Sequence, residues 1–316
     1  MNTFILNCES LCCFIASLFP KVFCTFTLTW SLYVILFIMD NHLLINLILI
    51  GLYILCLYTY YKIIYIGPGS PLDYADLRIN IQENPYGELN QQSPPNFMQL
   101  HTLKFGGSQG FRWCSKCNCW KPDRTHHCSS SGKCILKMDH YCPWFSTCIG
   151  FFNYKFFIQF LAYVAIYCWI VFIITLISLW NFFTQETFQD EFLSINVVIL
   201  CVLAFAFGIS LIIFLGFSVY LILRNLTTIE FQERRWNFRG GSGKENMFDL
   251  GYKKNWESVM GNNISTWLFP ISITNHDPKG YLSGINFPVN QDIYEELCHN
   301  AELQEQLNRQ LKNYRR

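Results

Sequence analysis

The chain has 316 residues, of which 52% are hydrophobic and 17% aromatic, while only 14% are charged. This composition is more apolar and less charged than that of an ordinary soluble domain, which indicates that lipid is part of the surroundings. The formal net charge of +1 argues against nucleic acid as a partner. Affinity for nucleic acid depends on clustered Lys and Arg side chains that neutralise phosphates.

Four stretches are long and apolar enough to cross a bilayer, which takes roughly 20 mostly apolar residues. They are Val22 to Met39, Leu43 to Tyr65, Phe156 to Trp180 and Ile195 to Leu223. The three polar residues between the first two predict a tight helical hairpin. The alternative, buried helices of a soluble all-α protein, fits poorly because soluble core helices rarely run this long without a polar face. The sequence therefore predicts an all-α polytopic membrane protein with four transmembrane helices.

The distribution of positive charge predicts the orientation, since Lys and Arg are retained on the cytoplasmic side. Four spans place both termini and the loop between spans two and three on one side. The two connections on the opposite side, 40–42 and 181–194, contain no Lys or Arg. We therefore expect the termini and the long loop to face the cytosol. In that reducing compartment, the 15 cysteines favour metal ligands, nucleophiles or small hydrophobes over disulfides.

These features divide the chain into five parts. They are a cytosolic N-terminal segment (1–21), a transmembrane hairpin (22–65), a cytosolic loop (66–155) with a cysteine-rich domain at about 112–151, spans three and four (156–223), and a cytosolic C-terminal region (224–316). The first segment lacks the basic start of a secretory signal. Its Cys8, Cys12 and Cys13 are either acylated or small interfacial hydrophobes. The last stretch, from Gln291, is either one polar helix or a solvated tail, and its uneven apolar spacing favours the tail.

The cysteine-rich domain carries a metal-binding pattern. Residues 112–151 hold seven cysteines and three histidines without helical periodicity, so we expect this segment to fold around metal rather than around an apolar core. Cys114 and Cys117 place two thiolates on one turn, and His127 with Cys134 can complete a tetrahedral Cys₃His zinc site. The alternative is a chance accumulation of buried cysteines.

A second constellation follows at residues 139–144, Asp-His-Tyr-Cys-Pro-Trp. A cysteine attacks as the thiolate, and with an ordinary pKa of about 8.5 only a few per cent is ionised near neutrality. His140 can remove the proton of Cys142, and Asp139 can fix the tautomer of His140 and stabilise its imidazolium form. The alternative is that His140 and Cys142 are two more metal ligands.

Together these motifs resemble the DHHC family of protein palmitoyltransferases. The resemblance runs through Arg112-x-Cys114-x-x-Cys117, Lys121-Pro122-x-Arg124-x-His126-His127-Cys128, Cys134-x-x-x-Met138-Asp139-His140-Tyr141-Cys142-Pro143-Trp144, Cys148-x-Gly150, Asn153, Thr227-Thr228-x-Glu230, Asn246-x-Phe248-Asp249-x-Gly251, Asn255-Trp256 and Gly261. It implies a two-step exchange, in which Cys142 takes an acyl group from palmitoyl-CoA and a cysteine of a membrane-associated substrate protein then takes it from Cys142. Exchange of one thioester for another is nearly balanced in energy, so catalysis is mainly positioning and deprotonation.

The resemblance also implies a tapering cavity for the acyl chain between the spans. Trp144 would line its mouth, and Tyr167 would lie near its closed end and limit the chain length. Both side chains could equally be ordinary packing of a helical bundle.

Further residues follow from the same resemblance. Lys121 and Arg124 match positions near the phosphates of CoA, with a solvated basic turn as the alternative. Thr228 would contact Asp139, and Asn246 belongs to a C-terminal motif that would buttress the site.

The pattern is altered at a second zinc site. The family normally holds a second Cys₃His set, whose positions correspond here to Cys128, Ser131, Tyr141 and Cys148. Serine is a poor zinc ligand and tyrosine is a rare one. We therefore predict one zinc, with Cys128 and Cys148 as remnants of a second site replaced by packing and hydrogen bonds. The Asp-His-Tyr-Cys variant also occurs in some fungal members of the family.

These losses raise two rival interpretations, an inactive membrane scaffold and a membrane-tethered zinc-finger module. An inactive scaffold should lack Asp139, His140 or Cys142, and all three are present.

Overall fold

The structure is a computed structural model that describes residues 8–79, 94–102, 111–184, 194–238, 245–273 and 283–314, with the side chains of 8–16 and 235–238 excepted. Cys8, Cys12 and Cys13 therefore lie outside the residues whose side chains are described. The helices are α1 Cys8–Tyr33, which continues into the π-helical turn Val34–Ile38, α2 Leu43–Ile66, α3 Tyr154–Thr184, α4 Ile195–Leu223, α5 Thr228–Phe238, α6 Tyr252–Met260, α7 Ile264–Leu268 and α8 Gln291–Tyr314. Short 3₁₀ turns follow α2 at Pro71–Asp73 and Ala75–Leu77.

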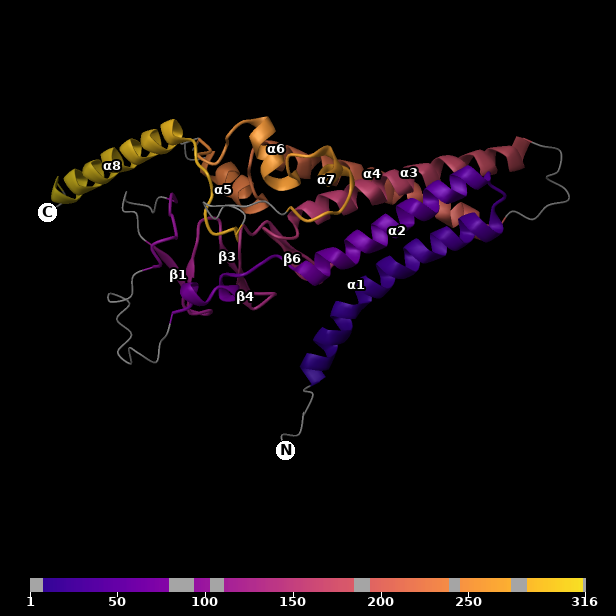
Figure 1. Cartoon of the computed structure of the whole chain (residues 1–316), viewed down its shortest axis with the longest axis horizontal. Helices are drawn as coiled ribbons and strands as arrows, with labels where there is room; N and C mark the ends of the chain where they lie inside the picture. Colours follow the sequence, from indigo (N-terminus) through magenta and orange to yellow (C-terminus); the bar gives the residue numbers. More distant parts are fainter. Residues whose placement is uncertain are drawn as a thin grey trace.

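Within the described residues, four helical segments are long and apolar enough to span a membrane: Ser17–Ile38, Leu43–Ile66, Tyr154–Thr184 and Ile195–Leu223. This confirms the prediction of a four-span membrane protein. The helix that holds the first span already forms before its expected start at Val22, because α1 continues through Pro20 without a break. Figure 1 shows α1 to α4 lying side by side along the long axis.

Helix α3 is the central helix of this bundle. It packs against both α2 and α4, and its buried Tyr167 and Val171 join Leu49 of α2 and Leu200 of α4 in one core. On the outer faces, large apolar side chains such as Phe37, Leu43 and Ile213 are exposed. Apolar exposure on this scale fits a surface solvated by lipid rather than by water.

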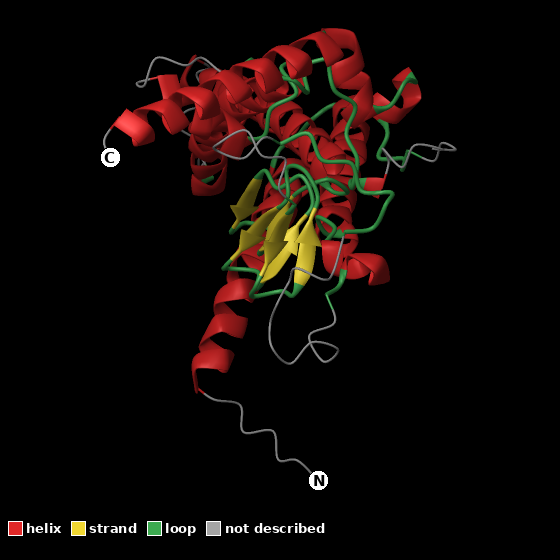
Figure 2. Cartoon of the chain, turned by 90° about the vertical axis from the view of Figure 1, so that its left-hand side faces the viewer, coloured by secondary structure: helices red, strands yellow, loops and turns green. Residues whose placement is uncertain are grey.

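The cysteine-rich domain folds into three antiparallel hairpins. They pair β1 Arg112–Cys114 with β2 Cys119–Lys121, β3 His126–Cys128 with β4 Lys133–Ile135, and β5 His140–Cys142 with β6 Thr147–Ile149. Figure 2 shows these strands beside the helices. A two-stranded hairpin this short is only marginally stable in isolation, so the domain depends on contacts between hairpins and with the spans.

Close packing ties the third hairpin to the second hairpin and to the chain that follows α2. Gly150, just after β6, has no space for a side chain, because a Cβ atom would lie 2.8 Å from the carbonyl oxygen of Leu136 and 2.9 Å from Pro68. The glycine of the Cys148-x-Gly150 motif is therefore required by close approach of two backbone segments.

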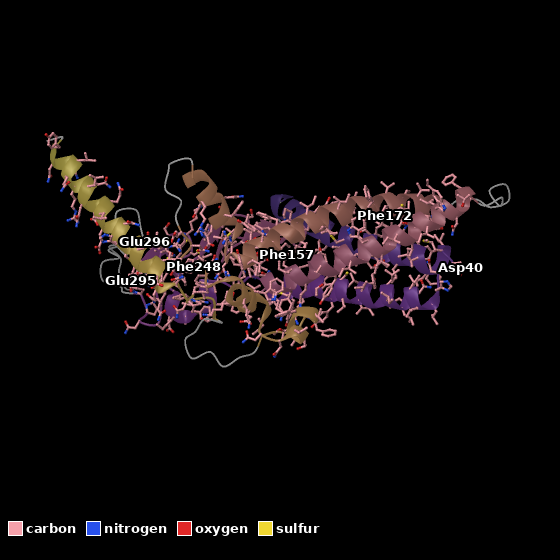
Figure 3. The ribbon with its side chains drawn as sticks, turned by 90° about the horizontal axis from the view of Figure 1, so that it is seen from above. Asp40, Phe157, Phe172, Phe248, Glu295 and Glu296 are labelled. Carbon is pink, nitrogen blue, oxygen red and sulfur yellow. The ribbon has the colours of Figure 1, made fainter. Side chains whose placement is uncertain are left out.

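The hairpins and helices α5, α6 and α8 gather at one end of the bundle, and α7 lies alongside that end, as Figure 1 shows. In Figure 3, Asp40 lies at the opposite end, followed along the long axis by Phe172, Phe157 and Phe248, with Glu295 beyond them on α8. Helix α8 has no buried residue. The tail interpretation favoured by the sequence is therefore wrong in one respect, because the stretch is solvated but forms a helix.

Candidate active site and metal centre

One metal-type cluster joins the first two hairpins. The ligand atoms of Cys114, Cys117, His127 and Cys134 all lie within 4.8 Å of one another. Nδ1 of His127 is 3.6, 3.2 and 4.0 Å from the sulfurs of Cys114, Cys117 and Cys134. Tetrahedral zinc with its usual bond lengths places such atoms roughly 3.6–3.8 Å apart. The predicted Cys₃His set is therefore assembled in a geometry compatible with zinc.

At the altered second site, a hydrogen bond and apolar packing connect the residues at the four positions. Oγ of Ser131 and Sγ of Cys148 form a hydrogen bond of 3.0 Å. Tyr141, opposite Cys148 in the β5–β6 ladder, packs against an apolar cluster that contains Cys128 and Cys148. Burial raises the pKa of Cys148 to about 12, which suits a neutral thiol in a hydrogen bond.

Strand β5 separates the altered site from a catalytic-type centre. Alternate residues of a strand face opposite sides, so His140 and Cys142 share one face and Tyr141 takes the other. Cys142 packs in a core built largely from the spans. The ring of His140 lies edge-on to Phe157 of α3, at a centroid distance of 5.4 Å. This alternation places the nucleophile and the base of the sequence prediction together at the end of the bundle.

Asp139, His140 and Cys142 lie next to one another. Nδ1 of His140 lies 2.6 Å from Oδ2 of Asp139, and both Asp139 and Cys142 interact with the His140 ring strongly enough to shift its pKa. Burial alone would lower the pKa of His140, but the hydrogen bonds and charges of Asp139 and Cys142 outweigh it and raise that pKa to about 9. His140 therefore holds a proton readily near neutral pH.

Asp139 is fixed from the C-terminal side of the chain. The backbone N–H of Thr228 donates to Oδ1 of Asp139 at 2.8 Å, and its hydroxyl donates to Oδ2 at 2.9 Å. Thr228 is the first residue of α5, so the carboxylate of Asp139 sits at a helix N-terminus, where negative charge is favoured. This is the contact that the resemblance implied for Thr228.

Arg124, expected near the phosphates of CoA, is instead a buried residue. It is 3% exposed and donates to both carboxylate oxygens of Glu230, at 2.7 and 2.8 Å. It also donates to the side-chain and backbone oxygens of Asn225, at 2.8 and 3.0 Å. With its donors engaged and its guanidinium buried, Arg124 clamps the α4–α5 junction to the cysteine-rich domain, and the structure does not support the expected contact with CoA phosphates.

Comparison with known proteins decides the family. The family model for DHHC palmitoyltransferase matches residues 108–235. The chain is 54% identical to Palmitoyltransferase PFA3 of Candida albicans, over 99% of this chain and 94% of the relative. It is 43% identical to Palmitoyltransferase PFA3 of Debaryomyces hansenii (97% and 91% covered) and 36% identical to Palmitoyltransferase PFA3 of Saccharomyces cerevisiae (94% and 93% covered). The chain belongs to the DHHC palmitoyltransferase family. It is a multi-pass membrane enzyme, a protein S-palmitoyltransferase.

The other residues predicted to contact the acyl chain or CoA are Trp144, Tyr167 and Lys121, and they lie in separate parts of this palmitoyltransferase. Trp144 is half-exposed; its carbonyl accepts a hydrogen bond from the Tyr60 hydroxyl at 2.7 Å, and its ring lies 6.2 Å from that of Phe23. Tyr167 is buried in α3, 2.8 Å from the hydroxyl of Ser31 in the first span. Lys121 is partly exposed at the end of β2.

Asn246 ties the C-terminal motif to the exit of α4. Its amide donates to the backbone carbonyls of Arg224, at 2.6 Å, and Asn225, at 3.1 Å. A cavity of about 170 Å³ lies behind the site and is lined by Asp139 together with Lys137, Thr227 and Ser272, among others.

Sequence reasoning missed several positioning residues. Asn255 stands in the quoted Asn255-Trp256 motif but was given no role; it is fully buried and donates to the carbonyl of Leu223 and the carboxylate of Asp249. Glu230 belongs to the quoted Thr-Thr-x-Glu motif, so a partner for Arg124 could have been sought there. Ser31 gives no sequence signal, because a lone serine in an apolar span has no pattern that marks it.

Proposed function

We propose that Cys142 is the acyl carrier of this palmitoyltransferase, with His140 as its base and Asp139 as the residue that orients the base. The observation that carries the proposal is the series of hydrogen bonds from Thr228 through Asp139 to His140, which shares one face of β5 with Cys142. A base that bonds its nucleophile on one side and a carboxylate on the other is the usual arrangement of an activated nucleophile.

The first half of the reaction acylates the enzyme. His140 holds the proton of Cys142 as an imidazolium, and the Cys142 thiolate attacks the thioester carbonyl of palmitoyl-CoA. The bond between carbonyl carbon and CoA sulfur breaks, and the leaving thiolate takes the proton from His140. Asp139 stabilises the imidazolium while it carries that proton. The products are palmitoyl-Cys142 and free CoA.

The second half moves the acyl group to a substrate. A cysteine thiol of a membrane-associated protein loses its proton to His140 and attacks the palmitoyl-Cys142 carbonyl, after which Cys142 leaves and regains a proton. Because one thioester replaces another, the enzyme contributes position and proton transfer rather than driving force.

The acyl chain would lie among the spans. Tyr167 and Ser31 meet across the bundle, which supports a role as the floor that limits chain length, and Trp144 would line the entrance. Lys121, which is partly exposed, remains the candidate contact for the CoA phosphates.

The Cys₃His cluster would hold one zinc ion. Bound zinc there would be structural, because all four positions of a tetrahedral site are taken by protein ligands. The positive charge distribution supports an active site, both termini and substrate cysteines on the cytosolic side.

Autoacylation of the purified full chain tests the proposal. Labelled palmitoyl-CoA should leave a label that neutral hydroxylamine releases in the wild type, and Cys142→Ser should abolish it. The matched control is Cys298→Ser, on α8, which should label like the wild type. Full labelling of the Cys142→Ser protein would show that another thiol carries the acyl group.

A further inference from the structure

Residues 264–273 form an apolar segment that no role described so far explains. The segment contains α7 and the extended residues after it, and none of its ten side chains is charged. Four large apolar side chains on it are more than half exposed: Ile264, Leu268, Phe269 and Ile271. A contiguous exposed apolar patch on a short segment indicates a partner other than water.

The backbone carbonyls of this segment are satisfied by side chains of the spans. Nε2 of Gln159, a buried residue of α3, lies 3.0 Å from the carbonyl oxygen of Thr266, 3.0 Å from that of Trp267 and 2.9 Å from that of Phe269. Three further donors are Tyr163 Oη to the carbonyl of Leu268, Lys62 Nζ to that of Pro270 and Lys155 Nζ to that of Ile271, each at 2.6 Å. The two N–H groups of Gln159 are shared among three carbonyls, and that of Phe269 also accepts from the backbone N–H of Ile271 at 2.8 Å. Every carbonyl from 266 to 271 therefore lies within hydrogen-bond distance of a donor.

Such complete pairing is what the interior of a membrane requires. A five-residue helix leaves its last carbonyls without intrahelical partners, and a surface loop would leave them to water. In hydrocarbon there is no water, so irregular backbone persists only where protein groups satisfy it.

The donors also give the depth of the segment. Tyr163 lies nine residues after Tyr154, the first residue of α3, which at 1.5 Å per residue is about 13 Å along the span. Lys62 and Lys155 lie near the span ends, where lysine side chains reach toward the interface. Figure 1 shows α7 alongside the bundle rather than beyond its end.

We propose that residues 264–273 are a re-entrant membrane segment, whose exposed apolar side chains contact the acyl chains of the phospholipid leaflet on the side of the cysteine-rich domain. A search for membrane helices by length does not find this segment, because α7 has only five residues. Its last residues, Ser272 and Ile273, line the cavity beside Asp139, so the embedded segment forms part of the wall behind the proposed active site.

Photo-cross-linking in a bilayer tests the proposal. The full chain carries p-benzoylphenylalanine at Leu268 in nanodiscs of phosphatidylcholine with tritiated acyl chains. The same residue at Ile213, exposed on α4, is the lipid-facing control, and at Leu307, exposed on α8, it is the water-facing control. Hydroxylamine treatment removes any label held as a thioester. We expect the adduct at Leu268 to match that at Ile213 and to exceed that at Leu307 about ten-fold. A yield at Leu268 equal to that at Leu307 overturns the proposal.

A second variant tests how the segment is held. Gln159→Leu removes the donor to three carbonyls, so the lipid adduct at Leu268 should fall several-fold. Gln306→Leu, at an exposed position of α8, is the matched control and should leave the yield unchanged. An unchanged yield in Gln159→Leu would show that these donors do not hold the segment in the bilayer.

Discussion

The two zinc-type sites of the cysteine-rich domain share one set of hairpins but depend on different forces. The Cys₃His cluster joins β1–β2 to β3–β4, and the apolar cluster around it consists mainly of its own cysteines with Leu72. The altered site lies beside β5–β6, whose Phe145 and Ile149 pack into a core shared with the spans. The ligand set is thus complete where the surrounding cluster is mostly cysteine. It is incomplete where Ile135, Met138 and Ile229 form an apolar cluster and the same hairpin also packs on the spans.

Removing a ligand from the intact site should have the largest effect. Cys117→Ala breaks the tetrahedral set, and structural zinc contributes on the order of 10 kcal/mol to the folding of small zinc domains. We expect zinc, measured by mass spectrometry of the purified protein, to fall from about one per chain to near zero. Limited proteolysis should then cut within residues 111–151. Cys298→Ala serves as the control, and zinc that persists at one per chain in Cys117→Ala would refute the assignment.

Asp139→Asn should have the next largest effect, on the rate of autoacylation. The proposed active centre shares β5 with the altered site but needs no metal there. Loss of the carboxylate leaves His140 poorly oriented, and autoacylation should slow about 100-fold or more. Zinc content should stay unchanged, which separates the two functions of the domain. Wild-type kinetics in Asp139→Asn would contradict the proposed role of Asp139.

The same variant predicts a change in pH dependence. The pKa of His140 in the folded protein, about 9, lies above its ordinary value of about 6.5. Protonated His140 therefore stabilises the fold fully below about pH 6.5, and this contribution is lost as pH rises through about 9. In Asp139→Asn the carboxylate no longer opposes the effect of burial on His140, so the pKa of His140 should fall. Melting temperatures in nanodiscs should then decline less between pH 7 and pH 9.5 than in the wild type; an equal decline in both would contradict this source of the pH dependence.

The zinc ligands and spans could be predicted from the sequence because each has a fixed spacing or length. The Cys114-x-x-Cys117 spacing places two thiolates on one turn, as a zinc site requires. A run of roughly 20 apolar residues is long enough to cross a bilayer. The burial of Arg124 could not be predicted, since its partner Glu230 is 106 residues away and a basic residue beside a turn fits a solvated position equally well. The segment 264–273 carries too few residues for any length criterion. Helix α8 was obscured by uneven apolar spacing, because no apolar face is buried to impose a period.

Rebuilding the second site sharpens the comparison. Ser131→Cys combined with Tyr141→His restores a Cys₃His set with Cys128 and Cys148. If only the ligands were lost, zinc should rise from about one to about two per chain. The single variant Ser131→Cys is the control and should remain near one. Failure of the double variant to gain zinc would show that the backbone of this site has also moved away from metal geometry.

The smallest effect is expected from Cys148→Ala. This change removes a fully buried sulfur and leaves Ser131 without the partner it has at 3.0 Å, which together should cost about 1–2 kcal/mol. Zinc should stay near one per chain, and autoacylation should persist, because Phe145 and Ile149 still anchor the β5–β6 hairpin to the spans. Cys134→Ala is the matched change in the intact site, and this variant should lose both its zinc and the folded structure of the domain. Equal losses in the two variants would mean that both sites depend on metal, and that the spans do not replace it.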